Sequence, residues 1–207
     1  QVELTTTPYY HPIMPLLMMD GWTFEDGIYV GKDSWPEDVE MHLNKGVSLF
    51  QQHTGVVPSG MWPSEQAVSP AMVQPVSNVG IDWMVSDEMI LEQSKDVNDL
   101  NPNVEDPRVL FTPWKVTGDE GGEVSVIFRD RVISDRIAFE YGSMEPVDAV
   151  DDFLGYMDNV RQELLDLGEN PSEHLITVAL DGENWMFMSE FQQNDNARPF
   201  VHEWYKR

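Results

Sequence analysis

The chain alternates short apolar stretches with longer amphipathic ones. Apolar residues recur every three or four positions between residues 36 and 53 and again between residues 146 and 167. This spacing predicts two amphipathic helices. A third helix is predicted from Ser69 to about Asn78, because a serine followed by a proline is typical of a helix start.

Short apolar runs between these helices predict strands. They lie at residues 2–5, 81–85, 109–116, 123–128 and 175–180. Strands that alternate with helices are typical of βα units, so we predict an α/β fold with a parallel sheet or barrel. Gly121 and Gly122 form a hairpin turn between two of the strands, and no linker interrupts the chain. We therefore predict a single domain over residues 1–207.

Composition narrows the possible partners. The 207 residues include 37 acidic and 12 basic side chains, for a net charge of −25. This charge repels phosphate backbones and anionic lipid, so nucleic acid and membrane surfaces are excluded as partners and neutral sugars fit better. The same charge is also typical of a solvated acidic surface without functional meaning.

The chain has no cysteine, so it can form no disulfide and no thiolate nucleophile. No apolar run approaches the roughly 20 residues of a membrane helix. We expect a soluble protein and leave its compartment open, with the cytoplasm favoured. The first five residues resemble the middle of a strand and residues 201–207 the middle of a helix, so we expect a part of a longer protein.

Acidic residues stand at the ends of the predicted strands. They are Glu3, Glu65, Asp87, Glu88, Asp130, Asp181 and Glu183. In a parallel βα barrel the carboxyl ends of the strands converge on the face that carries catalysis. Paired carboxylates there suit glycosidic cleavage, since one protonates the leaving oxygen and the other attacks the anomeric carbon or activates water. The alternative is that each carboxylate caps the helix that follows it.

Aromatic residues lie beside the same strand ends, namely Trp62, Trp83, Trp114 and Trp185. Sugar rings stack on aromatic faces, although any one of these tryptophans also fits a hydrophobic core. His11 could hydrogen-bond a sugar hydroxyl or bind a metal, but no second histidine has ligand spacing. We predict no metal site and no cofactor.

Four stretches of the chain are long and specific strings: residues 1–13, Gly60-Met-Trp-Pro-Ser-Glu65, residues 128–139, and Leu180-Asp-Gly-Glu-Asn-Trp185. They resemble the second, third, fourth and fifth motifs of glycoside hydrolase family 57, in particular of its amylopullulanase and α-amylase-like members. The resemblance runs over nearly the whole chain. It implies an incomplete (β/α)7 barrel of parallel strands and cleavage with retention of the anomeric configuration.

By this resemblance Glu65 is the nucleophile and the catalytic aspartate lies in the fourth motif. We predict Asp130, with Asp135 as the second candidate, because Asp130 directly follows the strand at 123–128. Retention requires the two carboxyl groups to stand about 5 to 5.5 Å apart. Asp130 also requires a raised pKa, which Arg129 or Arg131 would oppose. The predicted substrate-binding residues are Glu3, His11, Trp62, Trp83, Asp87, Glu88, Arg129, Asp181, Glu183 and Trp185.

Three departures from the family pattern are visible. The first motif, a His-Gln-Pro, is absent, Ala138 replaces an expected glycine, and the fifth motif continues as Asn184-Trp185-Met186. We therefore expect the missing N-terminal part of the barrel as a partner.

The predicted activity is hydrolysis of α-1,4 bonds, with α-1,6 bonds as further substrates, in starch, glycogen or pullulan. A 4-α-glucanotransferase or branching enzyme is the alternative. A carbohydrate-binding remnant without turnover belongs to a different class, and a metal-dependent deacetylase is disfavoured by the absence of its ligands.

Overall fold

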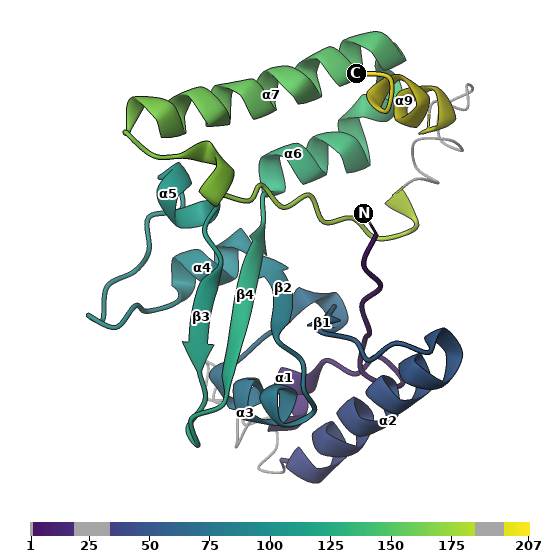
Figure 1. Cartoon of the computed structure of the whole chain (residues 1–207), viewed down its shortest axis with the longest axis vertical. Coiled ribbons are helices and arrows are strands. Elements are labelled where there is room, and N and C mark those ends of the chain that lie inside the picture. Colours follow the sequence, from purple (N-terminus) through teal and green to yellow (C-terminus); the bar gives the residue numbers. More distant parts are fainter. Residues whose placement is uncertain (1, 19–33, 185–196) are drawn as a thin grey trace, which may run out of the picture. The chain divides into compact units, whose positions relative to one another are not determined.

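The computed structural model describes residues 2–18, 34–184 and 197–207 (Figure 1). The chain divides into two compact units. Unit 1 comprises residues 1–86 and 113–127, and unit 2 comprises residues 87–112 and 128–207. Both units bury apolar side chains of their own. The single domain predicted over residues 1–207 stays a prediction.

The sheet has four described strands in the order β1-β2-β4-β3. They are β1 (Gly60–Met61), β2 (Trp83–Asp87), β3 (Trp114–Thr117) and β4 (Glu123–Arg129). β1 pairs with β2 in parallel, whereas β3 pairs with β4 in antiparallel register. The predicted α/β class is confirmed, and these strands form an open, mixed sheet.

The prediction of parallel strands is wrong for β3, whereas the hairpin turn predicted at Gly121 and Gly122 is confirmed. The hairpin turn reverses the chain, because the Gly118 N–H donates to the Gly122 carbonyl at 2.7 Å and Gly121 adopts a φ of 87°. Glycine reaches this left-handed conformation without steric cost.

Three helices accompany the sheet in unit 1: α1 (Met14–Met18), α2 (Pro36–Thr54) and α3 (Pro70–Asn78). The helices predicted at 36–53 and 69–78 are thus confirmed. Pro36 and the acidic side chains that follow it suit a helix N-terminus, and the left-handed Gly55 ends α2. The short 3-10 turn η1 (Ser64–Gln66) follows β1.

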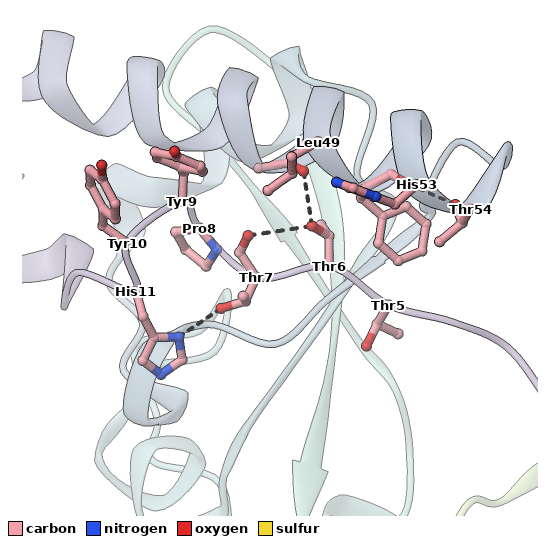
Figure 2. A pocket seen from close by; sticks show the side chains of 12 residues that line it. Thr5, Thr6, Thr7, Pro8, Tyr9, Tyr10, His11, Leu49, His53 and Thr54 are labelled. Atoms are coloured by element: carbon pink, nitrogen blue, oxygen red, sulfur yellow. Dashed lines mark hydrogen bonds between the residues drawn. The ribbon is translucent and has the colours of Figure 1, made fainter.

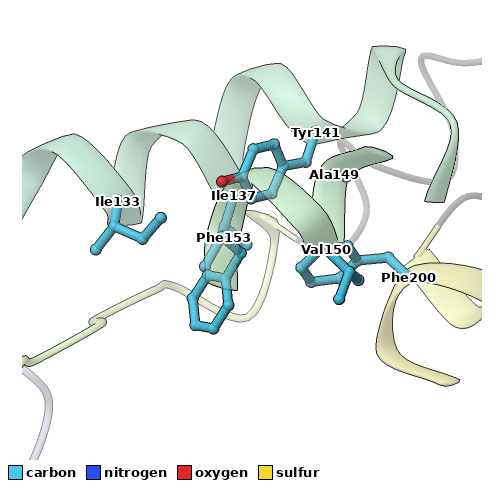
Figure 3. Packing of buried hydrophobic residues seen from close by; sticks show 7 residues of the cluster. All are labelled: Ile133, Ile137, Tyr141, Ala149, Val150, Phe153 and Phe200. Atoms are coloured by element: carbon cyan, nitrogen blue, oxygen red, sulfur yellow. The ribbon is translucent and has the colours of Figure 1, made fainter. Parts of the chain in front are cut away.

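Unit 2 is mainly helical. Its elements are α4 (Glu88–Gln93), α5 (Pro107–Leu110), α6 (Arg131–Asp135), the π-helical turn η2 (Arg136–Glu140), η3 (Tyr141–Ser143), α7 (Pro146–Asp166), η4 (Pro171–Glu173) and α9 (Ala197–Trp204). The long helix predicted at 146–167 is α7. Its apolar side packs with α6, η2 and α9 around Tyr141, Phe153 and Phe200 (Figure 3).

Three predicted strands differ in the structure. Residues 2–5 form no strand, and Thr6 after them makes a single parallel bridge to Met61. Residues 109–110 belong to α5, because Asp106 accepts a hydrogen bond from the Arg108 N–H and Pro107 suits the first helical position. The segment 175–180 forms only one parallel bridge, between Thr177 and Arg129. Two of its amides are bonded elsewhere: the Leu175 N–H donates to the Phe111 carbonyl, and the Ala179 N–H donates to Ser134 Oγ.

Within the described ranges, no helix is both long and apolar enough to cross a membrane.

Candidate active site

Glu65 lies in the η1 turn directly after β1, in unit 1. Glu65 and Gln66 have φ values of 56° and 55°, a left-handed conformation that is uncommon for residues other than glycine. Ser64 before it is buried, while the Glu65 side chain is 70% exposed. The turn therefore presents the carboxylate to solvent. Strained backbone of this kind is frequently found at functional sites.

Backbone pairing brings His11 to this turn. The Thr6 N–H donates to the Gly60 carbonyl at 3.1 Å, and the Trp62 N–H donates to the Thr6 carbonyl at 2.8 Å. Tyr10 and His11 are also left-handed, with φ values of 62° and 53°. His11 Nε2 lies 3.9 Å from Glu65 Oε1. The second and third predicted motifs thus meet at one point.

Thr7 holds the other side of the His11 ring. Thr7 Oγ1 and His11 Nδ1 lie 2.8 Å apart (Figure 2). Nothing in the sequence pattern marked Thr7, although it precedes His11 by four residues in the same motif. If the Thr7 hydroxyl donates to Nδ1, the neutral ring carries its proton on Nε2, on the side of Glu65.

A pocket of about 460 Å³ lies between the segment 5–11 and α2 (Figure 2). Gly46 of α2 forms part of its wall. A Cβ atom at Gly46 would stand 2.6 Å from the Thr7 carbonyl oxygen. Only glycine therefore allows α2 to approach the segment that carries His11 so closely.

Glu3 and Trp83 are also brought together in unit 1. Glu3 Oε1 accepts hydrogen bonds from Trp83 Nε1 at 3.3 Å and from Ser59 Oγ at 3.0 Å. The Trp83 ring packs against Gly60, where a Cβ would meet it at 2.3 Å. Trp62 and Trp114 are half-buried.

In unit 2, Arg129 joins three parts of the chain. Its Nη1 donates to Asp87 Oδ2 at 3.1 Å, its Nε donates to the Ala179 carbonyl at 3.1 Å, and its Nη2 donates to Asp135. The Arg129 side chain is only 14% exposed. Its donors are therefore largely engaged by protein groups.

Asp130 is fully buried. It caps α6 by accepting from the Ile133 N–H at 3.2 Å, and it accepts from the Tyr156 hydroxyl at 2.5 Å. Burial raises the pKa of Asp130 above its ordinary value, and the hydrogen bonds from Tyr156 and Ile133 oppose this rise. Tyr156 was not singled out from the sequence, because it lies among the apolar residues of α7.

Asp130 and Glu88 border a cavity of about 370 Å³. Glu88 accepts a hydrogen bond from the Arg131 N–H at 3.0 Å. Burial raises the pKa of Glu88, and the nearby charge of Asp130 adds to the rise against the opposing backbone hydrogen bond. The two carboxyl groups thus share a poorly solvated environment.

The remaining candidates follow the segment 175–180. Asp181 and Glu183 are exposed, and the Asp181 N–H donates to Asn184 Oδ1 at 2.9 Å. Trp185 lies outside the described residues. Among the described side chains, no group of three His, Asp or Glu residues is arranged to hold a metal ion.

Several solved structures share the fold of the chain. An α-amylase from Thermotoga maritima matches 99% of the chain at 15% identity, with a TM-score of 0.68, and a family 57 branching enzyme from Thermococcus kodakaraensis matches 98% at 14% identity and the same TM-score. An exo-type maltose-forming amylase from Pyrococcus matches 98% at 16% identity and a TM-score of 0.56. The chain spans 45%, 44% and 28% of these proteins, respectively. A comparison with curated protein sequences finds no match.

The family model for glycosyl hydrolase family 57 matches residues 1–207, the entire sequence. This match agrees with the four motifs read from the sequence. The chain therefore belongs to glycosyl hydrolase family 57.

Proposed function

We propose that the protein cleaves α-glucosidic bonds of α-glucans by double displacement, with Glu65 as the nucleophile. One observation carries the proposal: in a family 57 chain, a left-handed turn exposes the Glu65 carboxylate beside the His11 ring. A nucleophile must be accessible to the anomeric carbon and held in a defined orientation, and this turn supplies both.

The reaction has two steps. The Glu65 carboxylate attacks the anomeric carbon while the bond to the leaving oxygen breaks and an acid protonates that oxygen. Water then attacks the glycosyl-enzyme, the former acid takes its proton, and the Glu65 carboxylate leaves. Two inversions retain the anomeric configuration. A sugar hydroxyl in place of water would give transfer, the activity of a glucanotransferase or branching enzyme.

The acid is the other half of the pair, and the fourth motif offers two candidates for it. Asp130, the residue predicted from the sequence, is fully buried and caps α6. Asp135 is paired with Arg129. Asp130 borders a cavity and burial raises its pKa, as an acid that holds its proton near neutrality requires, so we propose Asp130 as the acid, with Asp135 as the second candidate. Asp181, which is exposed after the segment that bridges to β4, stays a proposed sugar contact.

The remaining candidates are proposed as sugar contacts. Trp62 and Trp83 offer aromatic faces, while Glu3, His11 and Glu183 offer polar groups for hydroxyls. The side chains of Asp87, Glu88 and Arg129 form hydrogen bonds with protein groups in unit 2. These bonds favour a role in holding neighbouring residues in place over direct contact with the sugar.

We further propose that the sheet is part of an incomplete (β/α)7 barrel. The parallel pairing of β1 with β2 and the parallel bridges at Thr6 and Thr177 support this proposal. The α-amylase and the branching enzyme are each more than twice as long as the aligned region, so segments outside this chain could complete the barrel.

The nucleophile is tested with Glu65→Gln in the full-length protein. The amide is nearly isosteric but is not nucleophilic, so kcat on starch should fall by a factor of about 10⁴ or more. Glu40→Gln, at an exposed position of α2, is the matched control and should keep full activity. Normal activity of Glu65→Gln would refute the proposal.

Products of the wild-type protein identify the reaction. Maltooligosaccharides shortened with uptake of water indicate a hydrolase, whereas longer products indicate a transferase. Pullulan tests the α-1,6 bonds. Oligosaccharide binding without any cleavage would favour the carbohydrate-binding remnant.

A further inference from the structure

The turn that carries Glu65 has an unfavourable backbone conformation. Glu65 and Gln66 are both left-handed, with φ values of 56° and 55°, and residues with a Cβ atom adopt this conformation at a steric cost. The Gln66 N–H donates to the Pro63 carbonyl at 2.8 Å. The Ala67 N–H donates to the Ser64 carbonyl at 3.1 Å. These two bonds lie within the turn, so they set its shape but do not fix it to the sheet.

Ser86 of β2 ties this turn to the sheet. Its Oγ donates a hydrogen bond to the Gln66 carbonyl at 2.8 Å. β1 ends at Met61, which is level with Met84 of the parallel β2, so β2 continues past the end of β1. Side chains alternate along a strand, which places Ser86 on the same face of β2 as Met84.

The Ser86 hydroxyl is sheltered from water. Ser86 is fully buried, and Met61 and Met84 are buried as well. A buried hydroxyl without a partner costs free energy, and the Gln66 carbonyl supplies that partner. Because water does not compete at the donor, the bond can hold the turn in one place.

The carbonyl that Ser86 holds belongs to the residue directly after Glu65. The Glu65 side chain is 70% exposed, so its direction depends on the backbone of the turn. Misplacement of a reacting group by about 1 Å can cost roughly 10²-fold in rate. A bond that fixes the Gln66 carbonyl therefore has direct influence on the position of the Glu65 carboxylate.

We propose that Ser86 is a positioning residue that holds the left-handed turn and thereby orients the Glu65 carboxylate for attack on the anomeric carbon. Ser86 acts through the Gln66 carbonyl and does not touch the substrate. The proposal rests on the proposed function for the role of Glu65, and it is independent of which carboxylate is the acid.

Covalent labelling of the full-length protein with 5-fluoro-α-maltosyl fluoride tests the proposal. The Glu65 carboxylate attacks the anomeric carbon and forms an ester while the bond to fluorine breaks and fluoride leaves; the ring fluorine slows hydrolysis of the ester. Fluoride leaves without a proton, so the labelling rate reports on the nucleophile rather than on the acid. In Ser86→Ala the limiting rate should fall by about 10- to 100-fold, with the half-saturating concentration changed less than about twofold.

Two further variants serve as comparisons. Ser86→Cys keeps a weak donor of similar size, so its labelling rate should lie between those of Ser86→Ala and wild type. Ser94→Ala removes a bond of the same kind at the end of α4, from Ser94 Oγ to the Ile90 carbonyl, and should label at the wild-type rate. A wild-type rate in Ser86→Ala, a change in half-saturation alone, or an equal loss in Ser94→Ala would overturn the proposal.

Hydrogen exchange separates this proposal from the proposed function. In Ser86→Ala the amides of Gln66 and Ala67 should exchange faster than in wild type, with those of α7 unchanged. This readout does not depend on turnover. If wild type takes up no label at Glu65 while exchange rises in Ser86→Ala, the proposed function fails but the hold of Ser86 on the turn stands. If exchange stays at the wild-type rate, the hold of Ser86 is itself refuted.

Discussion

At the scale of single residues, environment separates carboxylates that look alike in the sequence. Asp130 and Asp181 both follow predicted strands, yet the first is fully buried and the second is exposed. Asp130 acts as a helix cap and as the acceptor of the Tyr156 hydroxyl. The helix-capping alternative considered for every such carboxylate therefore describes Asp130 directly.

The pH dependence of stability tests the burial of Asp130. Because burial raises its pKa in the folded protein, folding favours the protonated form. The stability that this proton contributes is complete below the unfolded pKa of about 3.9 and is lost as the pH rises through the folded value. Asp130→Asn keeps a capping oxygen and cannot titrate. Relative to wild type, the free energy of unfolding of Asp130→Asn should therefore increase as the pH rises from about 4 to about 8. Urea denaturation measures this difference.

Asp106 provides a control of opposite sign. The hydrogen bond from the Arg108 side chain lowers the pKa of Asp106, so its stabilising effect is present above the unfolded pKa and is lost as the pH falls through the folded value. Asp106→Asn should therefore be less stable than wild type near neutral pH, and this difference in free energy of unfolding should shrink as the pH falls. A difference between wild type and Asp130→Asn that does not vary with pH would contradict the assigned burial.

At the scale of elements, local signals located the long helices well. Proline at the first position and regular apolar spacing predicted α2, α3 and α7, and the structure places them within one or two residues of the expected ends. Strands were harder to predict. Their pairing depends on partners far along the chain, which is why segment 175–180 has the apolar pattern of a strand but little of its hydrogen bonding.

Replacing glycine by alanine should have opposite effects on stability at two helical positions. Alanine favours a helix over glycine by about 1 kcal/mol. At Gly46 a Cβ would meet the Thr7 carbonyl oxygen at 2.6 Å, whereas at Gly155 of α7 nothing lies within 4 Å. Gly46→Ala should therefore destabilise the protein, by about 1 to 3 kcal/mol, and Gly155→Ala should stabilise it by about 0.5 to 1 kcal/mol.

Urea unfolding of both variants measures these differences. Gly46→Ala should also lower kcat, because its contact displaces the segment that carries His11, while Gly155→Ala should leave kcat unchanged. Equal stabilisation by both substitutions would show that α2 does not approach residues 7–9 as described.

At the scale of the whole molecule, charge is the dominant property. The net charge of −25 produces repulsion among carboxylates, which salt screens over a Debye length of about 10 Å at 0.1 M. Raising NaCl from about 0.05 to 0.5 M at pH 7 should therefore raise the melting temperature by several degrees. The increase should shrink near pH 4, where many carboxylates are protonated. A melting temperature that falls with salt at pH 7 would contradict this account.

The sequence by itself determined the α/β class, the long helices and membership of family 57, because apolar periodicity and contiguous motifs are local properties of the chain. It also directed attention to Glu65 and His11. Only the tertiary structure decided that segment 175–180 makes little strand pairing, that Thr7 holds His11, and that Asp130 is buried against Tyr156. Burial and hydrogen-bond partners depend on residues distant in sequence, and no local pattern specifies which of them meet.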